Sequence, residues 1–448
     1  MFKRKIEKEL IEWKESLKVK KKGLILKGMR QIGKTYIVKY FAQKNYNNVI
    51  YINFKVDISM KKAFEGDLQV STIIMNLSIL NPTFKFIPNE TVIILDEIQE
   101  CAGARASIKP FMEDGKFDII ATGSLLGIKG YNNNYHGGVS VGFEHTIYMR
   151  AMDFEEFLWA KGVNEEILKC VFECFNNKKK IPDLLHENLH KLFKEYICVG
   201  GLPAVVDSFI KTNDFRVARN EQKDILTSYK DDFAKHLNED ENEVLDKSLL
   251  SKINIVYNSI PSQLTKENKK FVYSMLEKKG TSMKYDPAIN WLNEYGLVEY
   301  CYNLHTLELP LEGNKIENNF KLFFSDSGLF ISMFDDDIVN DIFFGDMGIY
   351  KGVIYENIVA DAFIKNNIPL YYFSKSSGLE IDFVTRYNKK ITLIEVKATN
   401  GNTKSSKTIL EDNVKYPNVN QMIKLCESNI SCNDKCMTIP YYLAFLIK

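Results

Sequence analysis

Residues 28–35 contain the groups that a protein needs to hold a chain of phosphates. They read Gly-Met-Arg-Gln-Ile-Gly-Lys-Thr, which fits the pattern G-x-x-x-x-G-K-[ST], and the apolar residues before them predict a strand. Gly28 and Gly33 allow backbone angles that other residues resist, so successive N–H groups can point at phosphates where a helix begins. Lys34 would reach the β- and γ-phosphates, and the Thr35 hydroxyl would bind Mg²⁺. The segment therefore predicts a site for ATP or ADP with Mg²⁺.

A second set of polar residues follows a predicted buried strand. The apolar run at 91–95 is typical of a parallel sheet covered on both faces, and ligands bind where such strands end. There we expect Asp96 to hold Mg²⁺ through water and Glu97 to polarise the attacking water. Thr122 and Ser124 end the next strand, where each could either sense the γ-phosphate or cap the following loop. The predicted nucleotide contacts are Gly28, Met29, Arg30, Gln31, Ile32, Gly33, Lys34, Thr35, Tyr36 and Ser124.

A third set, near the C-terminus, has the residue types of a metal-dependent phosphodiesterase site. Glu356 lies in a predicted helix. Asp382 and Glu395 lie in two predicted strands that a turn joins into a hairpin, so their carboxylates can be neighbours. Lys397 follows Glu395 by two residues and faces the same way. Such acids hold Mg²⁺, which activates a water, and the lysine orients the water or neutralises the phosphate. A surface hairpin with an ordinary salt bridge explains the same residues, and both interpretations stay open.

The composition is that of an ordinary globular protein. Of 448 residues, 45% are hydrophobic and 26% charged, which is enough material for two or three domains. The net charge of +1 gives no global attraction to nucleic acid or membranes, so DNA binding requires a local basic patch. The sequence shows neither an apolar run of membrane-spanning length nor the apolar core of a signal peptide, so we expect a cytoplasmic protein.

The eight cysteines are scattered along the chain. Cys170/Cys174 and Cys432/Cys436 each have three residues between partners, but neither pair has a matching second pair or a nearby set of histidines. We therefore expect free thiols in a reducing compartment rather than a zinc site.

Strands and helices alternate over the first 150 residues, which indicates a parallel α/β sheet with right-handed crossovers. The predicted strands are 23–27, 48–54, 91–96, 117–122 and 143–149, and the predicted helices are 5–18, 34–45 and 104–113.

The middle of the chain changes character. Residues 152–260 are mainly helical in pattern; 267–278 and 285–295 predict two further helices, and 296–302 a strand. Helix, turn, helix and strand in this order are the outline of a winged helix. The second helix is not basic, which favours a packing or linker role over DNA reading. Residues 313–319 resemble a linker.

Taken together, these residues resemble a large prokaryotic family of AAA-type ATPases with a C-terminal domain of unknown function. The resemblance rests on 28–35, Leu-Asp-Glu-Ile-Gln (95–99), Ala-Thr-Gly-Ser-Leu-Leu-Gly (121–127), Asp-Phe-Glu-Glu-Phe-Leu (153–158), Gly-Gly-Leu-Pro (200–203), Leu-Phe-Phe-Ser-Asp-Ser-Gly-Leu (322–329) and Glu-Ile-Asp-Phe-Val (380–384). The tail is similar to the PD-(D/E)xK nuclease superfamily, and its Gly-x-x-x-Glu opening at Gly352 resembles archaeal Holliday-junction resolvases.

The resemblance implies three domains. They are an AAA-like P-loop NTPase sheet at 1–158, a helical and winged-helix-like region at 159–312, and a restriction-endonuclease-like α/β domain at 313–448. The sequence departs from the superfamily in having Glu-Ile-Asp where the superfamily's name has Pro-Asp. Basic residues near the hairpin are few, so no DNA track is obvious.

AAA enzymes usually complete the ATP site with an arginine from a neighbouring subunit, which would require a homo-oligomer. Among Arg30, Arg105 and Arg150 we favour Arg150, which follows a predicted strand. Over both sites, the predicted catalytic residues are Lys34, Glu97, Arg150, Asp382, Glu395 and Lys397, and the predicted metal ligands are Thr35, Asp96, Glu356, Asp382 and Glu395.

Our main hypothesis is an ATPase that couples its nucleotide state to a nuclease-like domain, which binds or cleaves DNA with Mg²⁺. The alternative is a signalling or docking protein whose C-terminal domain binds a partner protein without cutting anything. A third reading is a DNA-binding regulator that uses the winged-helix-like segment.

Overall fold

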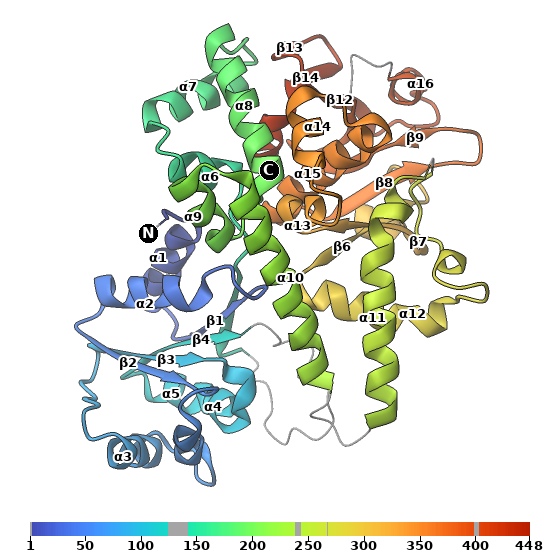
Figure 1. Cartoon of the computed structure of the whole chain (residues 1–448). Helices are drawn as coiled ribbons and strands as arrows, with labels where there is room; N and C mark the ends of the chain where they lie inside the picture. The colour runs from blue at the N-terminus through green and yellow to red at the C-terminus, as the bar shows by residue number, and fades with distance from the viewer. Residues whose placement is uncertain (1, 124–141, 238–242, 267, 398–402) are drawn as a thin grey trace. The chain divides into compact units, whose positions relative to one another are not determined.

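The computed structural model describes residues 2–123, 142–237, 243–266, 268–397 and 403–448 (Figure 1). The chain forms two compact units, Arg4–Arg150 and Ala151–Lys448, and the N-terminal end up to Lys3 groups with the second. In the described part of the chain, none of the helices is long and apolar enough to cross a membrane.

The first unit is built on a five-stranded sheet in which every pairing is parallel, in the order β2-β3-β4-β1-β5. β4 therefore separates β1, which leads into the glycine-rich loop, from β3, which leads to the two acids. All six residues of β3 are buried, as an apolar central strand requires. The five predicted strands are confirmed to within one residue at each end. They are β1 (Gly23–Lys27), β2 (Asn48–Asn53), β3 (Thr91–Asp96), β4 (Asp118–Gly123) and β5 (Glu144–Tyr148).

The helices predicted for this unit form, with one difference. The helix predicted at 104–113 is two shorter helices that meet at Ser107, whose hydroxyl donates to the carbonyl of Ala104 at 2.8 Å. Such a local hydrogen bond competes with continuation of a helix. The helices are α1 (Ile6–Ser16), α2 (Lys34–Asn45), α3 (Val70–Leu80), α4 (Ala102–Ala106) and α5 (Ile108–Asp114), with 3₁₀ turns η1 (Ile58–Phe64) and η2 (Ile98–Glu100).

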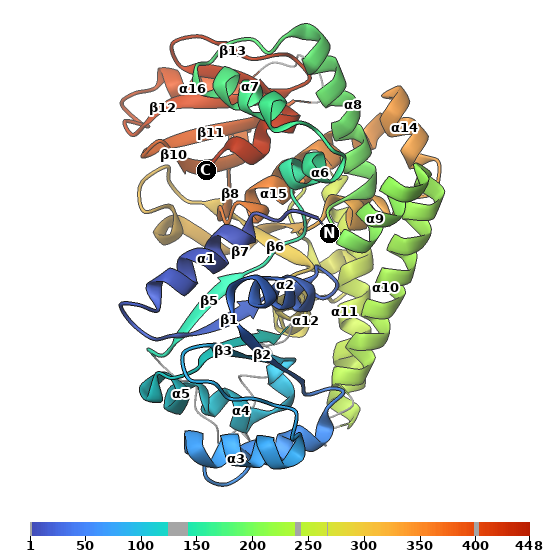
Figure 2. The same ribbon diagram turned by 90° about the vertical axis from the view of Figure 1, so that its left-hand side faces the viewer.

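The second unit begins with helices, as the pattern at 152–260 predicts. Asp153 starts the first of them with a capping box. The Asp153 side chain accepts a hydrogen bond from the backbone amide of Glu156, and the Glu156 side chain accepts one from the backbone amide of Asp153. α10 and α11 run side by side in both views (Figures 1 and 2). The helices are α6 (Phe154–Ala160), α7 (Glu165–Asn176), α8 (Asp183–Val199), α9 (Pro203–Thr212), α10 (Phe215–Leu237), α11 (Glu243–Leu264) and α12 (Ser282–Tyr295).

The prediction of a helix at 267–278 is wrong. From residue 268 to 281 the chain is a loop with one 3₁₀ turn, η4 (Tyr273–Met275). Tertiary contacts override the local preference: Gln263 hydrogen-bonds both the amide and the carbonyl of Val272, and the Phe271 amide donates to the carbonyl of Phe320 at 2.9 Å. The predicted winged-helix outline therefore lacks its first helix, and α11 and α12 precede the strands instead.

The linker predicted at 313–319 is also wrong, because residues from Lys315 onward form a strand. β7 (Lys315–Phe324) pairs antiparallel with β6 (Val298–Leu304), and η5 (Leu311–Asn314) joins the two. β6 also pairs in parallel with β8 (Leu370–Ser374), which pairs with β9 (Glu380–Ile381). One sheet, in the order β7-β6-β8-β9, thus combines strands of the middle and C-terminal segments.

A second sheet, in the order β10-β11-β12-β14-β13, carries the predicted hairpin. β10 and β11 are antiparallel, and β11, β12 and β14 are parallel to one another. α15 is buried along most of its length. The elements are α13 (Ser327–Ile331), α14 (Ile338–Phe344), η6 (Gly348–Tyr350), α15 (Lys351–Lys365), β10 (Phe383–Tyr387), β11 (Lys390–Val396), α16 (Lys404–Glu411), β12 (Val419–Cys426), β13 (Ser431–Cys432), β14 (Cys436–Pro440) and η7 (Tyr441–Leu446).

Candidate functional sites

The glycine-rich loop joins β1 to α2, as its sequence predicts. Gly33 starts the helix in the left-handed region, with φ 91°. At Gly28 a Cβ atom would lie 2.3 Å from the carbonyl oxygen of Met149, so a side chain has no room there. The side chains of Met29 and Ile32 are buried, whereas the Tyr36 side chain is exposed.

Lys34 is folded back onto this loop. Its Nζ donates to the carbonyl oxygens of Gly28 at 2.8 Å and Met29 at 2.7 Å. Burial lowers the pKa of Lys34 to about 8, against the opposing attraction of Glu97. The ammonium thus has neutral backbone partners, which a phosphate group could replace.

Asp96 is the meeting point of the predicted Mg²⁺ ligands. The Thr35 hydroxyl donates to Asp96 Oδ2 at 2.9 Å, which joins the start of α2 to the end of β3. Thr122 donates to the other carboxylate oxygen, Oδ1. The side chain is almost fully buried, so these partners fix the carboxylate's position.

Two further partners of Asp96 come from β2 and were not predicted. The Tyr51 hydroxyl donates to Asp96 Oδ2 at 2.7 Å, and the Asn53 amide donates to the same oxygen at 3.3 Å. Burial and then the hydrogen bond to Asp96 raise the pKa of Tyr51. The sequence contained one sign of these contacts. Tyr51 and Asn53 are two residues apart in β2, so their side chains lie on the same face of the strand.

Glu97 has a strained backbone and two side-chain partners. Its φ of 55° lies in the left-handed region, which is uncommon for a residue with a side chain. Gln99 donates to its carboxylate, and Lys55 Nζ lies 3.6 Å from Oε2. The carboxylate is thus held beside the end of β3, where a water-orienting base is expected.

The predicted arginines differ in their surroundings. Arg105 pairs with Glu144, with Nη2 3.4 Å from the carboxylate. The carbonyl of Arg150 accepts a hydrogen bond of 2.7 Å from Arg4, which also donates to the loop carbonyl of Ile32 at 3.1 Å. Arg4 was not predicted. The role of Arg150 as finger or sensor stays a prediction, and Ser124 lies outside the described residues.

The hairpin brings together three of the four residues predicted for the C-terminal site. Lys397 Nζ lies 2.6 Å from Glu395 Oε2 and 3.3 Å from Asp382 Oδ2. Asp382 also accepts from the Val396 amide at 2.8 Å, and Glu395 accepts from the Ser406 hydroxyl at 2.5 Å. Burial and then the charge of Asp382 raise the pKa of Glu395.

Glu356, on α15, faces two lysines that were not predicted. Lys269, from the loop after α11, forms an ion pair with Glu356 Oε1. Lys321, on β7, is fully buried: burial lowers its pKa, but Glu356, Glu380 and Asp382 outweigh burial and raise it. Burial raises the pKa of Glu356, with Lys269 acting in the opposite sense. We call Lys269, Lys321, Glu356, Glu380, Asp382, Glu395 and Lys397 the acid–lysine cluster.

The acid–lysine cluster does not fit a divalent metal ion as it stands. Its oxygen donors are of the type that Mg²⁺ prefers, but Lys269 contacts Glu356 and Lys397 contacts both hairpin acids. Among the described residues, no group of three or more Asp, Glu, His or Cys side chains is arranged to hold a metal ion. The predicted metal ligands Glu356, Asp382 and Glu395 therefore stay a prediction for a rearranged cluster.

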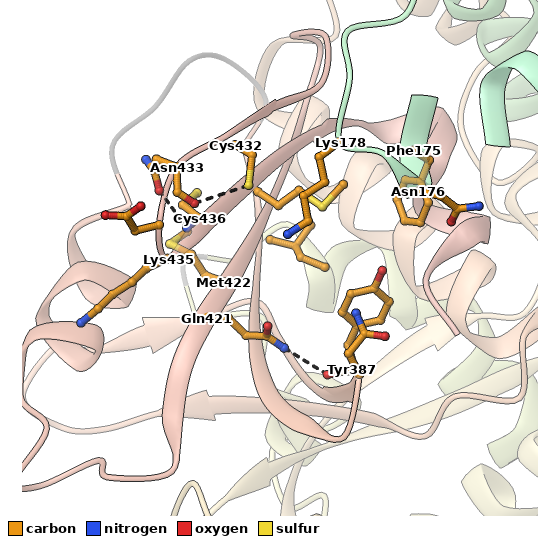
Figure 3. A pocket seen from close by; sticks show the side chains of 14 residues that line it. Phe175, Asn176, Lys178, Tyr387, Gln421, Met422, Cys432, Asn433, Lys435 and Cys436 are labelled. Carbon is orange, nitrogen blue, oxygen red and sulfur yellow. Dashed lines mark hydrogen bonds between the residues drawn. The ribbon is translucent and has the colours of Figure 1, made fainter. Parts of the chain in front are cut away.

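A pocket of about 240 Å³ lies elsewhere in the second unit, between the end of α7 and strands β12 and β14 (Figure 3). Gln421 donates there to the carbonyl of Tyr387 at 3.0 Å, and Cys432 and Cys436 line the pocket (Figure 3). Both thiols are free. None of the predicted site residues lines this pocket.

Comparisons with known protein families support an ATPase-type domain in the first unit. Residues 20–158 match the AAA domain family, whereas 190–337 match a domain of unknown function, DUF8612, and 351–442 another, DUF4143. No curated protein matches the chain.

Several solved structures are distantly similar. A Walker-type ATPase of Pyrococcus abyssi has a TM-score of 0.41 and 15% identity, over 74% of this chain and 96% of its own. The ORC2 protein of Aeropyrum pernix, in ADPNP and ADP complexes, has a TM-score of 0.34 and 12% identity, over 76% of this chain and 93% of its own. The Holliday junction branch migration motor RuvB of Thermotoga maritima has a TM-score of 0.28 and 14% identity, over 66% of this chain and 89% of its own. Scores of this size define no function for this chain. The family match and the loop geometry together identify residues 20–158 as an AAA-type P-loop ATPase domain.

Proposed function

We propose that the first unit binds and hydrolyses ATP, with Lys34, Thr35, Asp96 and Glu97 as the working groups. The observation that carries this proposal is the hydrogen bond between Thr35 and Asp96, which joins the phosphate loop to the acidic strand end. Thr35 and Asp96 would hold Mg²⁺, because their oxygens already lie together, and the ion would supply positive charge that neutralises the phosphates.

The roles of the other residues follow from their contacts. Lys34 would exchange two carbonyl partners for phosphate oxygens, and the change favours its charged form. Glu97 would orient the attacking water, and Thr122 would position Asp96 from the neighbouring strand β4. An arginine from another copy, for which we retain Arg150, would complete the site in a homo-oligomer.

The test compares nucleotide binding with turnover in the full chain. Lys34→Ala should weaken ATP binding by about 100-fold or more, because it removes the ammonium group that lies against the loop carbonyls of Gly28 and Met29. Glu97→Gln should bind ATP normally and hydrolyse it at least about 100-fold more slowly. Lys44→Ala, on the exposed end of α2, is the matched control. Normal turnover by Glu97→Gln would assign the base to another residue.

For the second unit we propose a nucleotide-controlled docking domain, because lysines already balance its buried acids. This is the alternative that the sequence left open, and the ion pairs of Lys269 and Lys397 favour it. A nuclease remains the second candidate, since Lys397 contacts both Asp382 and Glu395 and these are the residue types that such a site requires.

DNA cleavage separates the two candidates. Purified chain is incubated with Mg²⁺ or Mn²⁺ and labelled linear or four-way-junction DNA, beside an Asp382→Ala control. Metal-dependent cutting that the control lacks would establish the nuclease. Intact DNA beside normal ATP hydrolysis would support the docking domain.

A further inference from the structure

Arg4 contacts the phosphate loop although it lies outside the part of the chain that matches the ATPase family, residues 20–158. Its guanidinium donates through Nη1 to the carbonyl oxygen of Ile32 at 3.1 Å and through Nη2 to the carbonyl oxygen of Arg150 at 2.7 Å. Arg4 is only 8% exposed. One buried side chain therefore ties the loop to the backbone segment that follows β5.

The position of Arg4 is set by α1. The backbone amide of Arg4 donates to Glu7 Oε1 at 3.3 Å, so Arg4 is fixed where the helix begins. Leu10 and Trp13 are buried on one side of α1, and the rings of Trp13 and Phe41, the latter on α2, lie 6.4 Å apart. α2 is the helix that the phosphate loop starts. The arginine is thus carried by a helix that packs against the phosphate-binding helix.

The hydrogen bond to Ile32 fixes the direction of a loop amide. A trans peptide is planar, so the carbonyl of Ile32 and the N–H of Gly33 point in opposite directions. Arg4 holds that carbonyl on its own side, and the Gly33 N–H therefore points away from Arg4. Gln31 and Gly33 flank Ile32 in the left-handed region, with φ of 62° and 91°. This backbone pattern turns successive N–H groups toward one anion.

The hydrogen bond to Arg150 supplies a fixed support. The Met149 amide donates to the carbonyl at the end of β1 at 2.8 Å, so the chain stays paired with the sheet beyond β5. The carbonyl oxygen of Met149 also lies so close to Gly28 that a Cβ there would be 2.3 Å away. The backbone at 149–150 thus supports the start of the loop directly and, through Arg4, supports Ile32 near its end.

We infer that Arg4 is a positioning residue for ATP binding, which holds the carbonyl of Ile32 so that the Gly33 N–H is directed at the phosphates. This inference rests on the proposed ATPase function and extends it to a residue outside the matched domain. Lys34 brings charge to the phosphates, whereas Arg4 gives a backbone amide its direction. An arginine suits this task because its planar fork donates to two carbonyls at once in a fixed geometry.

The test compares ATP hydrolysis and ADP binding in the full chain and its Arg4 variants. Arg4→Ala should raise the KM for ATP by about tenfold or more and weaken ADP binding by a similar factor, because both nucleotides lose a directed amide. kcat should change by less than about threefold, since that amide serves the ground state and the transition state alike. A variant that is merely less well folded would instead show a lower apparent kcat with an unchanged KM.

Chemical rescue and matched variants assign the effect to the guanidinium. Millimolar guanidinium should restore most of the ADP affinity of Arg4→Ala, and sodium at the same ionic strength should not. Arg4→Lys keeps the charge but not the fork, so its KM should lie between those of Arg4→Ala and the unchanged chain. Lys8→Ala, at an exposed position of α1, is the control and should behave as the unchanged chain.

An unchanged KM in folded Arg4→Ala would overturn the inference, as would a loss of ADP affinity that guanidinium does not restore. Circular dichroism checks the fold, and where only Arg4→Lys folds, a KM equal to that of the unchanged chain overturns the inference. The proposed function has its own readout. An unchanged chain that neither binds nor hydrolyses ATP would refute the ATPase, whereas ATP binding that depends on Lys34 but not on Arg4 would refute only the role of Arg4.

Discussion

The two sites of this protein both contain a lysine that contacts its own chain, but the partners differ in charge. Lys34 donates to two backbone carbonyls, which are neutral and leave the ammonium uncompensated. Lys397 lies between two carboxylates and is compensated within the fold. The first arrangement attracts an anionic ligand, whereas the second has satisfied its own charges.

The acids of the two sites differ in the same way. Asp96 accepts hydrogen bonds from hydroxyl and amide donors of two strands and a helix, none of them cationic. Asp382 and Glu395 have a lysine between them, and Glu356 has another. A carboxylate held by neutral donors keeps its charge available for Mg²⁺. Motifs with similar residue types can therefore be open in one unit and closed in the other.

The largest effect that we expect from this difference concerns stability. Lys397→Met should lower the free energy of unfolding of the second unit by about 2–4 kcal/mol, because Asp382 and Glu395 would remain buried without a counter-ion. Urea unfolding monitored by tryptophan fluorescence measures this change. Lys390→Met, at the exposed first residue of β11, is the matched control and should change stability by less than about 0.5 kcal/mol. Equal losses in both variants would show that Lys397 is not a structural counter-ion.

The first site could be predicted from sequence because its groups are fixed by local structure. The loop needs Gly28 and Gly33 at set positions, and the ends of parallel strands meet at one edge, which brings Asp96 to Thr35. Tyr51 and Asn53 were missed because their contact depends on β2 lying next to β3. The sequence pattern around Tyr51 and Asn53 does not reveal which strand lies next to β2 in the sheet.

The acid–lysine cluster could be predicted only in part, for a related reason. Asp382, Glu395 and Lys397 lie in one hairpin, whose turn sets their register. Lys269 lies 87 residues before Glu356, and Lys321 lies 59 residues before Glu380. No periodic pattern links positions so far apart. The region around Lys269 was predicted as a helix because its helix-forming residues outweighed the strand contact of Phe271, which only the folded chain makes.

The pH dependence of ATP binding sharpens the comparison further. Lys34 has a pKa of about 8 in the free protein, because burial opposes its charge. Phosphates favour the charged form, so binding should take up a proton above pH 8. Affinity should be constant below pH 8 and weaken above it by up to about tenfold per pH unit. Calorimetry in buffers of different ionisation enthalpy measures the proton uptake directly.

The outcome discriminates clearly between the two kinds of lysine. Lys44→Ala should keep the same profile, since its side chain lies on the exposed end of α2. An affinity that stays flat to pH 9.5 would mean that Lys34 is fully charged before ATP arrives. Lys397, by contrast, should stay protonated over this pH range. Burial opposes its charge, but Asp382 and Glu395 outweigh burial and raise its pKa.

The smallest expected effect tests whether the ion pair with Lys55 restrains the carboxylate of Glu97. Lys55 lies 3.6 Å from Glu97, and both side chains are partly exposed, so the pair contributes about 0.2–1 kcal/mol. Lys55→Ala should therefore free the carboxylate and raise single-turnover ATP hydrolysis by about 1.5- to 5-fold, with ATP affinity unchanged. Lys62→Ala, an exposed lysine of η1, is the control. A slower reaction in Lys55→Ala would instead place the Lys55 ammonium on the developing phosphate charge. The first unit would then keep a charged group for the reaction where the second uses its lysines to close the site.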